Sequence, residues 1–368
     1  MTWTHTQTRL RNWLFDQSLP LWAKAGQDDQ GRFYEKLDLE GRPLTGMARR
    51  TRVQARQTYV FIQAHALAWQ GAEPLARAGL DCLIRDYARP DGLWVRALDD
   101  AGRVHDDTPD LYDLAFVLYA LASAHRVLSD DRALPLALKT LAAINSLMSE
   151  EAGGWSESLP PVLPRRQNPH MHMLEALLAW QEIAPDPAFE AAARSVLALL
   201  TRHFFDREHL VLGEFYDHDW SIRPGSEGQT VEPGHHLEWV WLLGEAHRLG
   251  LGNYASPARA LYTTATTCGL NAKGLAVREI TRIGQVRDGG TRLWGQTELL
   301  RTLTTRGELD RASAVTDTLF QTHLATQVSG LWFDTFDAEG ISHDTTVPAS
   351  SLYHLMTAIT AVLSQPHD

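Results

Sequence analysis

The chain has 368 residues, more than the ~100–150 of a typical single domain, so two domains or one large ring are the architectures to weigh. Its formal net charge is −11 and it has no long Lys/Arg run, which argues against nucleic acid and anionic membranes as partners. No apolar run reaches the ~20 residues of a membrane span, the N-terminal residues lack a signal-peptide pattern, and Cys82 and Cys268 suit a reducing compartment. We therefore expect a cytoplasmic monomer or homodimer whose partner is a small molecule.

An internal repeat of about sixty residues organises the chain. Six segments begin with polar or aromatic residues and continue as an apolar helix: QARQTYVFIQAHAL, DLYDLAFVLYALAS, NPHMHMLEALLAW, PGHHLEWVWLLGEA, TRLWGQTELLRTL and ASSLYHLMTAITAV. One polar residue from each segment gives successive spacings of 57, 59, 63, 61 and 58 residues; these residues are Arg56, Asp113, His172, His235, Gln296 and His354. The common helical solenoids repeat every ~33–47 residues, which is too short for this period.

Two further features recur at the same interval. A glycine followed by apolar or aromatic residues marks each unit, at positions 31, 92, 154, 213, 274 and 330. Three of these glycines lead into the turn-like sequences LDLEGRP, LDDAGRV and FDAEGIS, which predict β-hairpin loops. Amphipathic helices are predicted near 73–88, 131–149, 186–204, 254–268 and 308–323, because apolar residues recur there at i, i+3 and i+4.

These elements predict an all-α fold. Each unit reads as a polar-started helix, an amphipathic helix and a hairpin loop, and six such units close most naturally into a double ring. The polar-started helices are apolar on nearly all sides, so we expect them to form the inner ring. Twelve helices in six inner/outer pairs would then carry short β-hairpin loops at one mouth. No Pro/Ser-rich linker divides the chain, and we expect residues 1–368 to form a single domain.

Polar residues gather at the starts of the inner helices, which would all meet at one mouth. A closed ring would bring these residues around one pocket: Arg56, Tyr112, Asp113, Asn168, His172, His235, Glu238, Trp294, Gln296, Glu298 and His354. Three of the six starts carry histidine, whose ordinary pKa of ~6.5 suits proton transfer near neutral pH. A capping or hydrogen-bonded histidine is the alternative at any one of these positions.

The spacing of these side chains allows several roles. His235 and Glu238 are three residues apart and share a helix face, so the carboxylate could orient the imidazole or bind a substrate hydroxyl. His170 and His172 lie about 200° apart on a helix, and no H-E-x-x-H motif occurs, so we expect no metal site; His235 with Glu238 is the remaining alternative. Arg56 could bind a sugar hydroxyl or an anion, or pair with Asp113. Tryptophans suit a sugar pocket, and Trp294 is the stronger candidate, since the loop tryptophans could equally pack the hairpins onto the ring.

Six short motifs, one in each unit, carry a family resemblance. They are QAR at 54–56, LYDLAF at 111–116, NPHMHMLEA at 168–176, EPGHHLEW at 232–239, WGQTE at 294–298 and LYH at 352–354. Together they resemble the N-acylglucosamine 2-epimerase superfamily, which includes cellobiose 2-epimerases, D-mannose isomerases and sulfoquinovose isomerases. The resemblance implies an (α/α)6 barrel and an enzyme that needs no cofactor.

The resemblance also implies roles for individual residues. His235 and His354 fall on the family's acid–base pair, and Arg56, His172 and Glu238 fall on positions that bind sugar hydroxyls and assist ring opening. Tyr112, Asn168 and Trp294 resemble further substrate contacts. The expected architecture adds two more candidates to the substrate-binding set, Gln296 and Glu298.

We therefore expect an aldose–ketose isomerase that converts free D-mannose to D-fructose by ring opening and a cis-enediolate proton transfer. The tryptophan in EPGHHLEW favours this branch of the superfamily. The alternatives are a 2-epimerase of mannose/glucose, N-acylglucosamine or a disaccharide reducing end, an (α/α)6-barrel glycoside hydrolase, and a non-catalytic binding protein. A phosphorylated or sulfonated sugar also stays open, because four arginines are expected near the mouth: Arg49, Arg50, Arg165 and Arg223.

Overall fold

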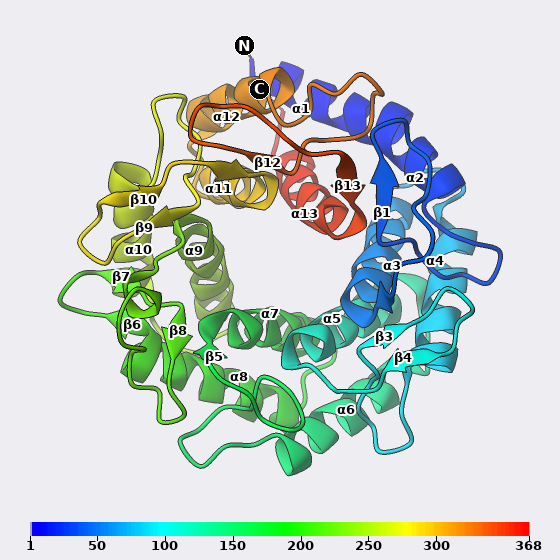
Figure 1. The fold of residues 1–368 in the computed structure, drawn as a ribbon, viewed down its shortest axis with the longest axis horizontal. Helices are drawn as coiled ribbons and strands as arrows, with labels where there is room; N and C mark the ends of the chain where they lie inside the picture. Colours follow the sequence, from blue (N-terminus) through cyan, green and yellow to red (C-terminus); the bar gives the residue numbers. More distant parts are fainter. Residues whose placement is uncertain (1, 368) are drawn as a thin grey trace.

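The computed structural model describes residues 2–367 and shows two concentric rings of helices (Figure 1). Within this range the inner ring consists of α3 (Thr51–Ala66), α5 (Leu111–Leu128), α7 (Gln167–Ile183), α9 (Pro233–Arg248), α11 (Leu293–Thr305) and α13 (Leu352–Leu363). Contact between α13 and α3 closes this ring. All six inner helices begin at the segments that the repeat identified, so the sequence located them correctly.

The outer ring begins at the N-terminus. A continuous helical segment is formed by α1 (Trp3–Asn12), a π-helical stretch η1 (Trp13–Ser18) and α2 (Leu19–Ala25), and α1 contacts both α12 and α13. This segment is the sixth outer helix, which the repeat did not locate, and it completes the predicted (α/α)6 barrel. The other five are α4 (Ala72–Cys82) with η2 (Leu83–Tyr87), α6 (Ala133–Leu147), α8 (Pro187–Leu199) with η3 (Leu200–Phe204), α10 (Ala255–Cys268) and α12 (Leu309–Gln321).

The apolar sequence of the inner helices matches their position. Helix α5 is the one described helix that is long and apolar enough to cross a membrane, yet most of its residues are buried between α3 and α7. Its Leu114, Phe116 and Leu118 belong to one hydrophobic core shared by both rings. Burial of apolar surface on all sides therefore accounts for the composition of α5.

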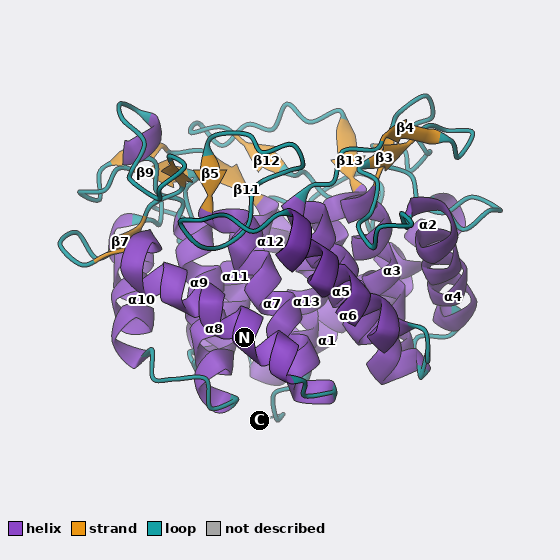
Figure 2. Ribbon diagram, turned by 90° about the horizontal axis from the view of Figure 1, so that it is seen from below, coloured by secondary structure: helices purple, strands orange, loops and turns teal. Residues whose placement is uncertain are grey.

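The strands and long loops lie together at one end of the barrel (Figure 2). Three short strands lead directly into inner helices and a fourth, β13, does so through the 3-10 turn η5 (Ala349–Ser351); each pairs antiparallel with a strand of another loop. The pairs are β2 (Arg49–Arg50) with β3 (Ala97–Leu98), β5 (Arg165–Arg166) with β8 (Phe215–Tyr216), β11 (Thr291–Arg292) with β12 (Thr335–Phe336), and β13 (Thr346–Pro348) with β1 (Lys36–Asp38). This pairing links neighbouring units and fixes where each of these inner helices starts.

Local hairpins also form, in part where the sequence predicts them. The LDDAGRV segment connects β3 to β4 (Val104–Asp106), and LDLEGRP makes a tight turn closed by a bridge between Leu37 and Pro43. FDAEGIS differs, because β12 pairs with β11 of the preceding loop and only a turn follows it. The remaining hairpins are β6 (Phe205–Asp206) with β7 (Val211–Leu212) and β9 (Glu279–Ile280) with β10 (Val286–Asp288).

Four of the six recurring glycines, Gly31, Gly92, Gly154 and Gly330, allow the loops to lie against the outer helices. Gly31 has a φ of +83°, and a Cβ there would stand 2.3 Å from the carbonyl oxygen of Ala78 in α4. Gly330 has a φ of +92°, and its Cβ would stand 2.6 Å from the carbonyl oxygen of Gln17. Only glycine fits such left-handed, close-packed positions without strain.

A buried side chain at the fourth residue of four inner helices holds the adjoining hairpin. Gln296 accepts a hydrogen bond from the Ala276 amide at 2.7 Å and donates to the Ala276 carbonyl at 2.8 Å. Gln54 does the same for its loop, accepting from the Phe33 amide and donating to a carbonyl. His170 and His236 accept from backbone amides through Nε2. The loops are therefore tied to the inner helices by side chains that point away from the barrel axis.

Candidate active site

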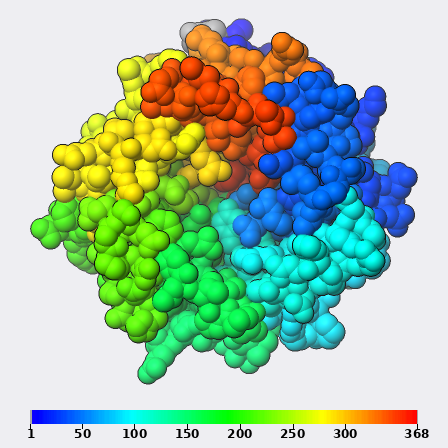
Figure 3. Space-filling view, viewed as in Figure 1, coloured from blue at the N-terminus to red at the C-terminus, as the bar shows by residue number. Residues whose placement is uncertain are grey.

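The mouth of the barrel opens onto a cavity of about 150 Å³ at its centre, and the hollow is visible from the loop-bearing face in Figure 3. Eight of the eleven residues predicted to surround the pocket line it: Arg56, Tyr112, Asn168, His172, His235, Glu238, Trp294 and His354. The other three, Asp113, Gln296 and Glu298, do not. Four further residues that the sequence did not single out complete the lining: Glu232, Arg292, Ser350 and Ser351. The inner helices therefore do meet around one pocket.

Position along the helix explains which side chains reach the cavity. The eight predicted residues that reach it stand at the second, third or sixth residue of their helices, and the sixth lies four residues from the second and three from the third, on the same face. Gln296 stands at the fourth residue of α11, about 200° around the helix from Trp294, and its amide is bound to backbone groups. The placement of Gln296 in the pocket is therefore corrected: it supports the hairpin instead.

His354 has a single carboxylate partner. Its Nδ1 lies 2.8 Å from Oε1 of Glu298, and both side chains are almost fully buried. Burial lowers the pKa of His354 well below its ordinary value, and the nearby Arg56 guanidinium lowers it further. Burial also raises the pKa of Glu298 to about 7, against the opposing effect of Arg301. The imidazole is therefore neutral at neutral pH, and Glu298 lies behind it, outside the cavity lining.

His235 stands in a more acidic setting. Its Nδ1 lies 3.0 Å from Oε2 of Glu214 and 3.7 Å from Oε2 of Glu232. Burial disfavours the imidazolium, but the charges of these two carboxylates outweigh that effect and raise the pKa of His235 to about 10. The expectation that Glu238 orients His235 is therefore corrected, because Glu214 and Glu232 occupy that role.

The sequence did not predict the role of Glu214, or the hydrogen bonds that hold its carboxylate in place. It follows the glycine of the GEFYDHD landmark, between β7 and β8. Gln167 donates to Oε2 of Glu214 at 2.9 Å, and its own side-chain oxygen accepts from the indole of Trp239 at 2.7 Å. The tryptophan of the EPGHHLEW motif thus supports the carboxylate that holds His235.

A third histidine, His172, faces two carboxylates. Its Nδ1 lies 3.1 Å from Oε2 of Glu175 and 3.6 Å from Oε1 of Glu238. Tyr353 donates to Glu175 at 2.6 Å and Arg301 lies 3.7 Å from it; with His172 they outweigh burial and lower the pKa of Glu175 to about 2. Burial, followed by repulsion from Glu298 and Glu175, raises the pKa of Glu238 well above its ordinary value. The raised pKa favours the neutral form of Glu238, whose side chain lines the cavity.

The arginine at the cavity wall does not pair with Asp113. Arg56 donates to the Tyr112 hydroxyl at 2.6 Å and its guanidinium lies 3.9 Å from the centre of the Phe116 ring, while Asp113 binds Arg52 instead. Among the described residues no hydrogen-bond partner satisfies Arg56 Nε or Asn168 Oδ1, although both atoms are buried. Both groups remain free to bind a ligand.

Trp294 lies close to both candidate catalytic histidines. Its ring centre is 4.8 Å from that of His235 and 6.0 Å from that of His354. The loop tryptophans have a packing role instead: the Trp94 indole donates to Thr140, and Trp332 stacks on Trp22. Trp294 is therefore the aromatic residue placed to contact a sugar that both imidazoles reach.

The four arginines expected near the mouth are occupied. Arg49 pairs with Asp28 and Asp100, Arg50 with Glu35, and Arg223 with Asp217 and Glu227. Arg165 donates to backbone carbonyls and stacks on Trp220. None of them lines the central cavity.

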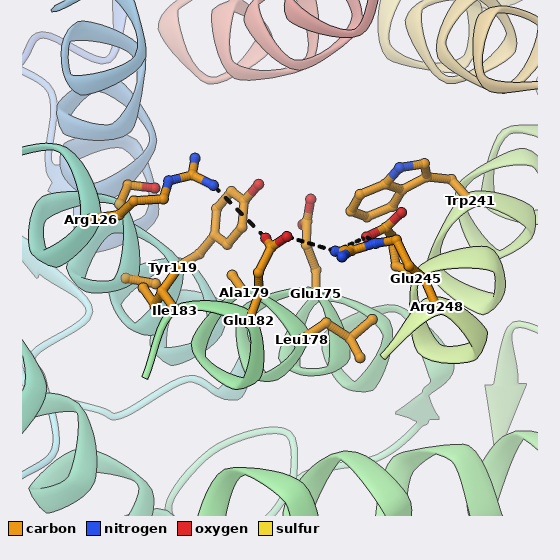
Figure 4. Close-up of a pocket in the computed structure, with 12 residues that line it drawn as sticks. Tyr119, Arg126, Glu175, Leu178, Ala179, Glu182, Ile183, Trp241, Glu245 and Arg248 are labelled. Atoms are coloured by element: carbon orange, nitrogen blue, oxygen red, sulfur yellow. Dashed lines mark hydrogen bonds and ion pairs between the residues drawn. The ribbon is translucent and has the colours of Figure 1, made fainter. Parts of the chain in front are cut away.

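A second pocket of about 120 Å³ lies at the C-terminal ends of α5, α7 and α9, opposite the loops (Figure 4). Its charged side chains pair with one another: Glu182 lies 2.8 Å from Arg248 and 3.9 Å from Arg126. Glu175 lies on its inner wall and also bonds to His172 of the central cavity. The acid–base groups are therefore concentrated at the loop-bearing end.

Two sets of three side chains in the described residues are close enough to share one cation. They are His172 with Glu175 and Glu238, and His235 with Glu214 and Glu232. In both sets a single imidazole nitrogen faces two carboxylates.

Comparison with known proteins agrees with this architecture. The N-acylglucosamine 2-epimerase (GlcNAc 2-epimerase) family model matches residues 31–358. The chain is 35% identical over 367 residues to the mannose-6-phosphate isomerase of Rhizobium meliloti, covering 95% of each chain. It is 24% identical to the cellobiose 2-epimerase of Bacteroides fragilis, with 88% of each chain covered.

A solved structure extends the comparison to the fold. The crystal structure of a D-mannose isomerase superposes with a TM-score of 0.84 at 22% identity, covering 98% of this chain and 97% of that one. The family model spans most of the chain, and the first of these relatives matches it nearly end to end. The chain therefore belongs to the N-acylglucosamine 2-epimerase family.

Proposed function

We propose that this protein is a cofactor-independent aldose–ketose isomerase that converts free D-mannose to D-fructose. One observation carries the proposal: two imidazoles close to Trp294 face one sugar-sized cavity, each with Nδ1 held by a carboxylate. Holding Nδ1 directs the other ring nitrogen toward the cavity. The relative named mannose-6-phosphate isomerase supports isomerisation of a mannose-type sugar.

The different surroundings of the two histidines give them different roles, one as the acid and the other as the base. Groups whose environments push their pKa values apart take the acid and base roles of a reaction. His235, charged at neutral pH, is the acid that gives its proton to the ring oxygen as the pyranose opens and takes one back from the O1 hydroxyl, which leaves the open-chain aldehyde. It then protonates O1 and accepts the proton of the O2 hydroxyl during the isomerisation. His354, neutral at neutral pH, is the base that removes the proton from C2.

The remaining residues stabilise the intermediate. Removal of the C2 proton leaves a cis-enediolate whose negative oxygen needs nearby donors. Arg56 offers its unbound Nε, and Glu238 offers the hydroxyl of a neutral carboxylic acid. Protonated His354 then returns the proton to C1, which gives the ketose and restores the neutral base.

The lining of the cavity favours an unphosphorylated sugar. Two arginines line it, but Arg56 already donates to a tyrosine hydroxyl and Arg292 lies 3.7 Å from Asp334. The carboxyl groups of Glu232 and Glu238 line it with them. Among the described residues, a phosphate dianion would therefore find no guanidinium group in the lining without another partner, whereas a neutral hexose meets a dense set of hydrogen-bonding partners.

The same geometry supports one alternative, a sugar 2-epimerase. If His235 delivers a proton to C2 from the face opposite His354, the product is the C2 epimer. The relative named cellobiose 2-epimerase favours this alternative. A glycoside hydrolase needs two carboxylates flanking the scissile bond, whereas Glu214 and Glu298 are each engaged by an imidazole.

Proton NMR in D2O separates these functions. The protein is incubated with mannose, with mannose 6-phosphate and with cellobiose in parallel. We expect fructose from mannose, at a kcat/KM at least tenfold above that for the phosphate. Glucose appearing before fructose would assign the epimerase, cleavage of cellobiose would assign the hydrolase, and a preference for the phosphate would overturn the argument from charge.

A further inference from the structure

The set of His235, Glu214 and Glu232 has the dimensions of a metal site. Around a tetrahedral Zn²⁺ with bonds of ~2.0–2.2 Å, neighbouring ligand atoms stand about 3.4 Å apart. Nδ1 of His235 lies 3.0 Å and 3.7 Å from the nearest oxygens of Glu214 and Glu232, which brackets that spacing. All three ligand atoms lie within 4.8 Å of one another. A small displacement of side chains would place a cation among them.

An unsatisfied atom points to a missing ligand at the same place. Glu214 is only 3% exposed, and its Oε2 accepts from His235 and Gln167. Its Oε1 is buried without a hydrogen-bond partner among the described residues. A buried carboxylate oxygen left unpaired is costly, and a cation bound to the same carboxylate would offset that cost.

The neighbouring set of His172, Glu175 and Glu238 has almost the same distances, 3.1 Å and 3.6 Å. Glu238 Oε1 in that set is also buried without a hydrogen-bond partner among the described residues. The set nevertheless already has positive charge and a donor, because Arg301 lies 3.7 Å from Glu175 and Tyr353 donates to it. All three members of that set are buried. We therefore expect a cation to bind less favourably to this set than to the His235 set.

The His235 set differs in charge and access. Among the described residues no Lys or Arg forms an ion pair with its two carboxylates, and Glu232 lies at the cavity wall with about a third of its side chain exposed (29%). Arg292, the arginine that also lines this side, is paired with Asp334 at a loose 3.7 Å. A hydrated cation can therefore enter through the mouth and reach Glu232 first.

We propose that His235, Glu214 and Glu232 form a binding site for one divalent transition-metal ion of the Zn²⁺ type, and that this ion inhibits the enzyme by occupying its acid. One imidazole and two carboxylates suit Zn²⁺, whereas Mg²⁺ prefers oxygen ligands and retained water. The ion replaces the proton on Nδ1 and leaves a coordination position open toward the cavity. The inhibition rests on the proposed function, but the binding does not.

Isothermal titration of the metal-free full chain with ZnCl2, and separately with MgCl2, measures the site directly. We expect one Zn²⁺ per chain, no comparable heat with Mg²⁺, and at least tenfold weaker Zn²⁺ binding in both Glu232→Gln and Glu214→Gln. Glu238→Gln is the matched control in the neighbouring set, and His343→Ala tests an exposed histidine paired with Asp337. Both controls should bind Zn²⁺ as the unmodified protein does. Circular dichroism of each variant verifies folding.

Activity assays with mannose complete the test. Zn²⁺ should inhibit the unmodified enzyme at the concentrations that saturate the titration, and a chelator should restore full activity. Absence of saturable Zn²⁺ binding, or its loss in Glu238→Gln or His343→Ala instead of Glu232→Gln, would overturn the site. Binding without inhibition would overturn its inhibitory role, and absence of any sugar conversion would refute the proposed function while leaving the binding result intact.

Discussion

The two sides of the active site are built alike and charged differently. On each side an inner helix presents a histidine at its third residue, and a carboxylate binds Nδ1 at about 3 Å: 2.8 Å for His354 and 3.0 Å for His235. His354 shares its surroundings with Arg56 and Arg301, whereas His235 faces a second carboxylate. A carboxylate partner therefore orients a histidine, but the sum of nearby charges decides whether that histidine carries a proton.

The strongest test of this difference removes each imidazole in turn. His354→Asn deletes the base, so we expect kcat for mannose to fall about 10³-fold and exchange of the C2 proton with D2O to cease. His235→Asn should also lower kcat, but it should leave measurable C2 exchange in sugar molecules that open spontaneously. Rate and exchange are measured together by NMR. Equal loss of C2 proton exchange in both variants would contradict the assignment of His354 as the base and His235 as the acid.

Replacing each carboxylate partner with its amide tests why the two histidines differ in protonation. Glu214→Gln takes a negative charge from His235, whose pKa should fall from about 10 toward the ordinary ~6.5. At pH 7.5 only about one-tenth of such a histidine is protonated, so we expect roughly tenfold lower kcat/KM. The alkaline limb of the pH profile should move to lower pH. Glu298→Gln should change kcat/KM less at this pH, since His354 is neutral with or without that charge.

Arg56 offers a smaller test on the other side. Its charge helps to keep His354 unprotonated, so Arg56→Gln should raise the pKa of His354. A base is active only when deprotonated, and a raised pKa therefore moves the acid limb of kcat/KM to higher pH. We also expect KM to rise about tenfold, through loss of a charge-assisted hydrogen bond of ~1.5 kcal/mol. An unchanged acid limb together with a raised KM would restrict Arg56 to substrate binding.

The smallest catalytic effect is expected outside the pocket. Gln296→Ala leaves backbone groups of Ala276 without partners, so the free energy of unfolding should fall by about 2 kcal/mol while KM changes less than threefold. Denaturant unfolding and steady-state kinetics measure the two effects. A large rise in KM without loss of stability would return Gln296 to the substrate-binding set.

The fold was predictable from the sequence because each structural repeat begins with the same pattern of residue types. Apolar helices preceded by polar residues recur every sixty residues, and glycines such as Gly31 recur with them because a backbone approach leaves no room for Cβ. The N-terminal outer helix was not predicted, because it precedes the first complete unit. The pairing of β12 with β11 was not predicted either, because contacts between successive loops leave no local sequence pattern.

The site was predictable only in part, for a geometric reason. Helix periodicity identifies a shared face once the start of a helix is known, and an error of one residue turns a side chain by about 100°. That error placed Gln296 in the pocket. Glu214 was not predicted because its partner His235 is distant from it in sequence. Glu175 was not predicted because it lies beyond the first two turns of α7 and its partner Tyr353 is on another helix. Long-range hydrogen bonds of this kind appear only in the folded chain.

The central claim is that His235 is protonated and His354 is neutral in the same cavity, and imidazole ¹⁵N chemical shifts test it directly. The spectrum is recorded at pH 7.5 on chelator-treated, ¹⁵N-histidine-labelled protein, with His235→Asn and His354→Asn assigning the signals. The account predicts two protonated nitrogens in His235 and one protonated nitrogen in His354. The same protonation state in both rings, whether neutral or charged, would contradict it.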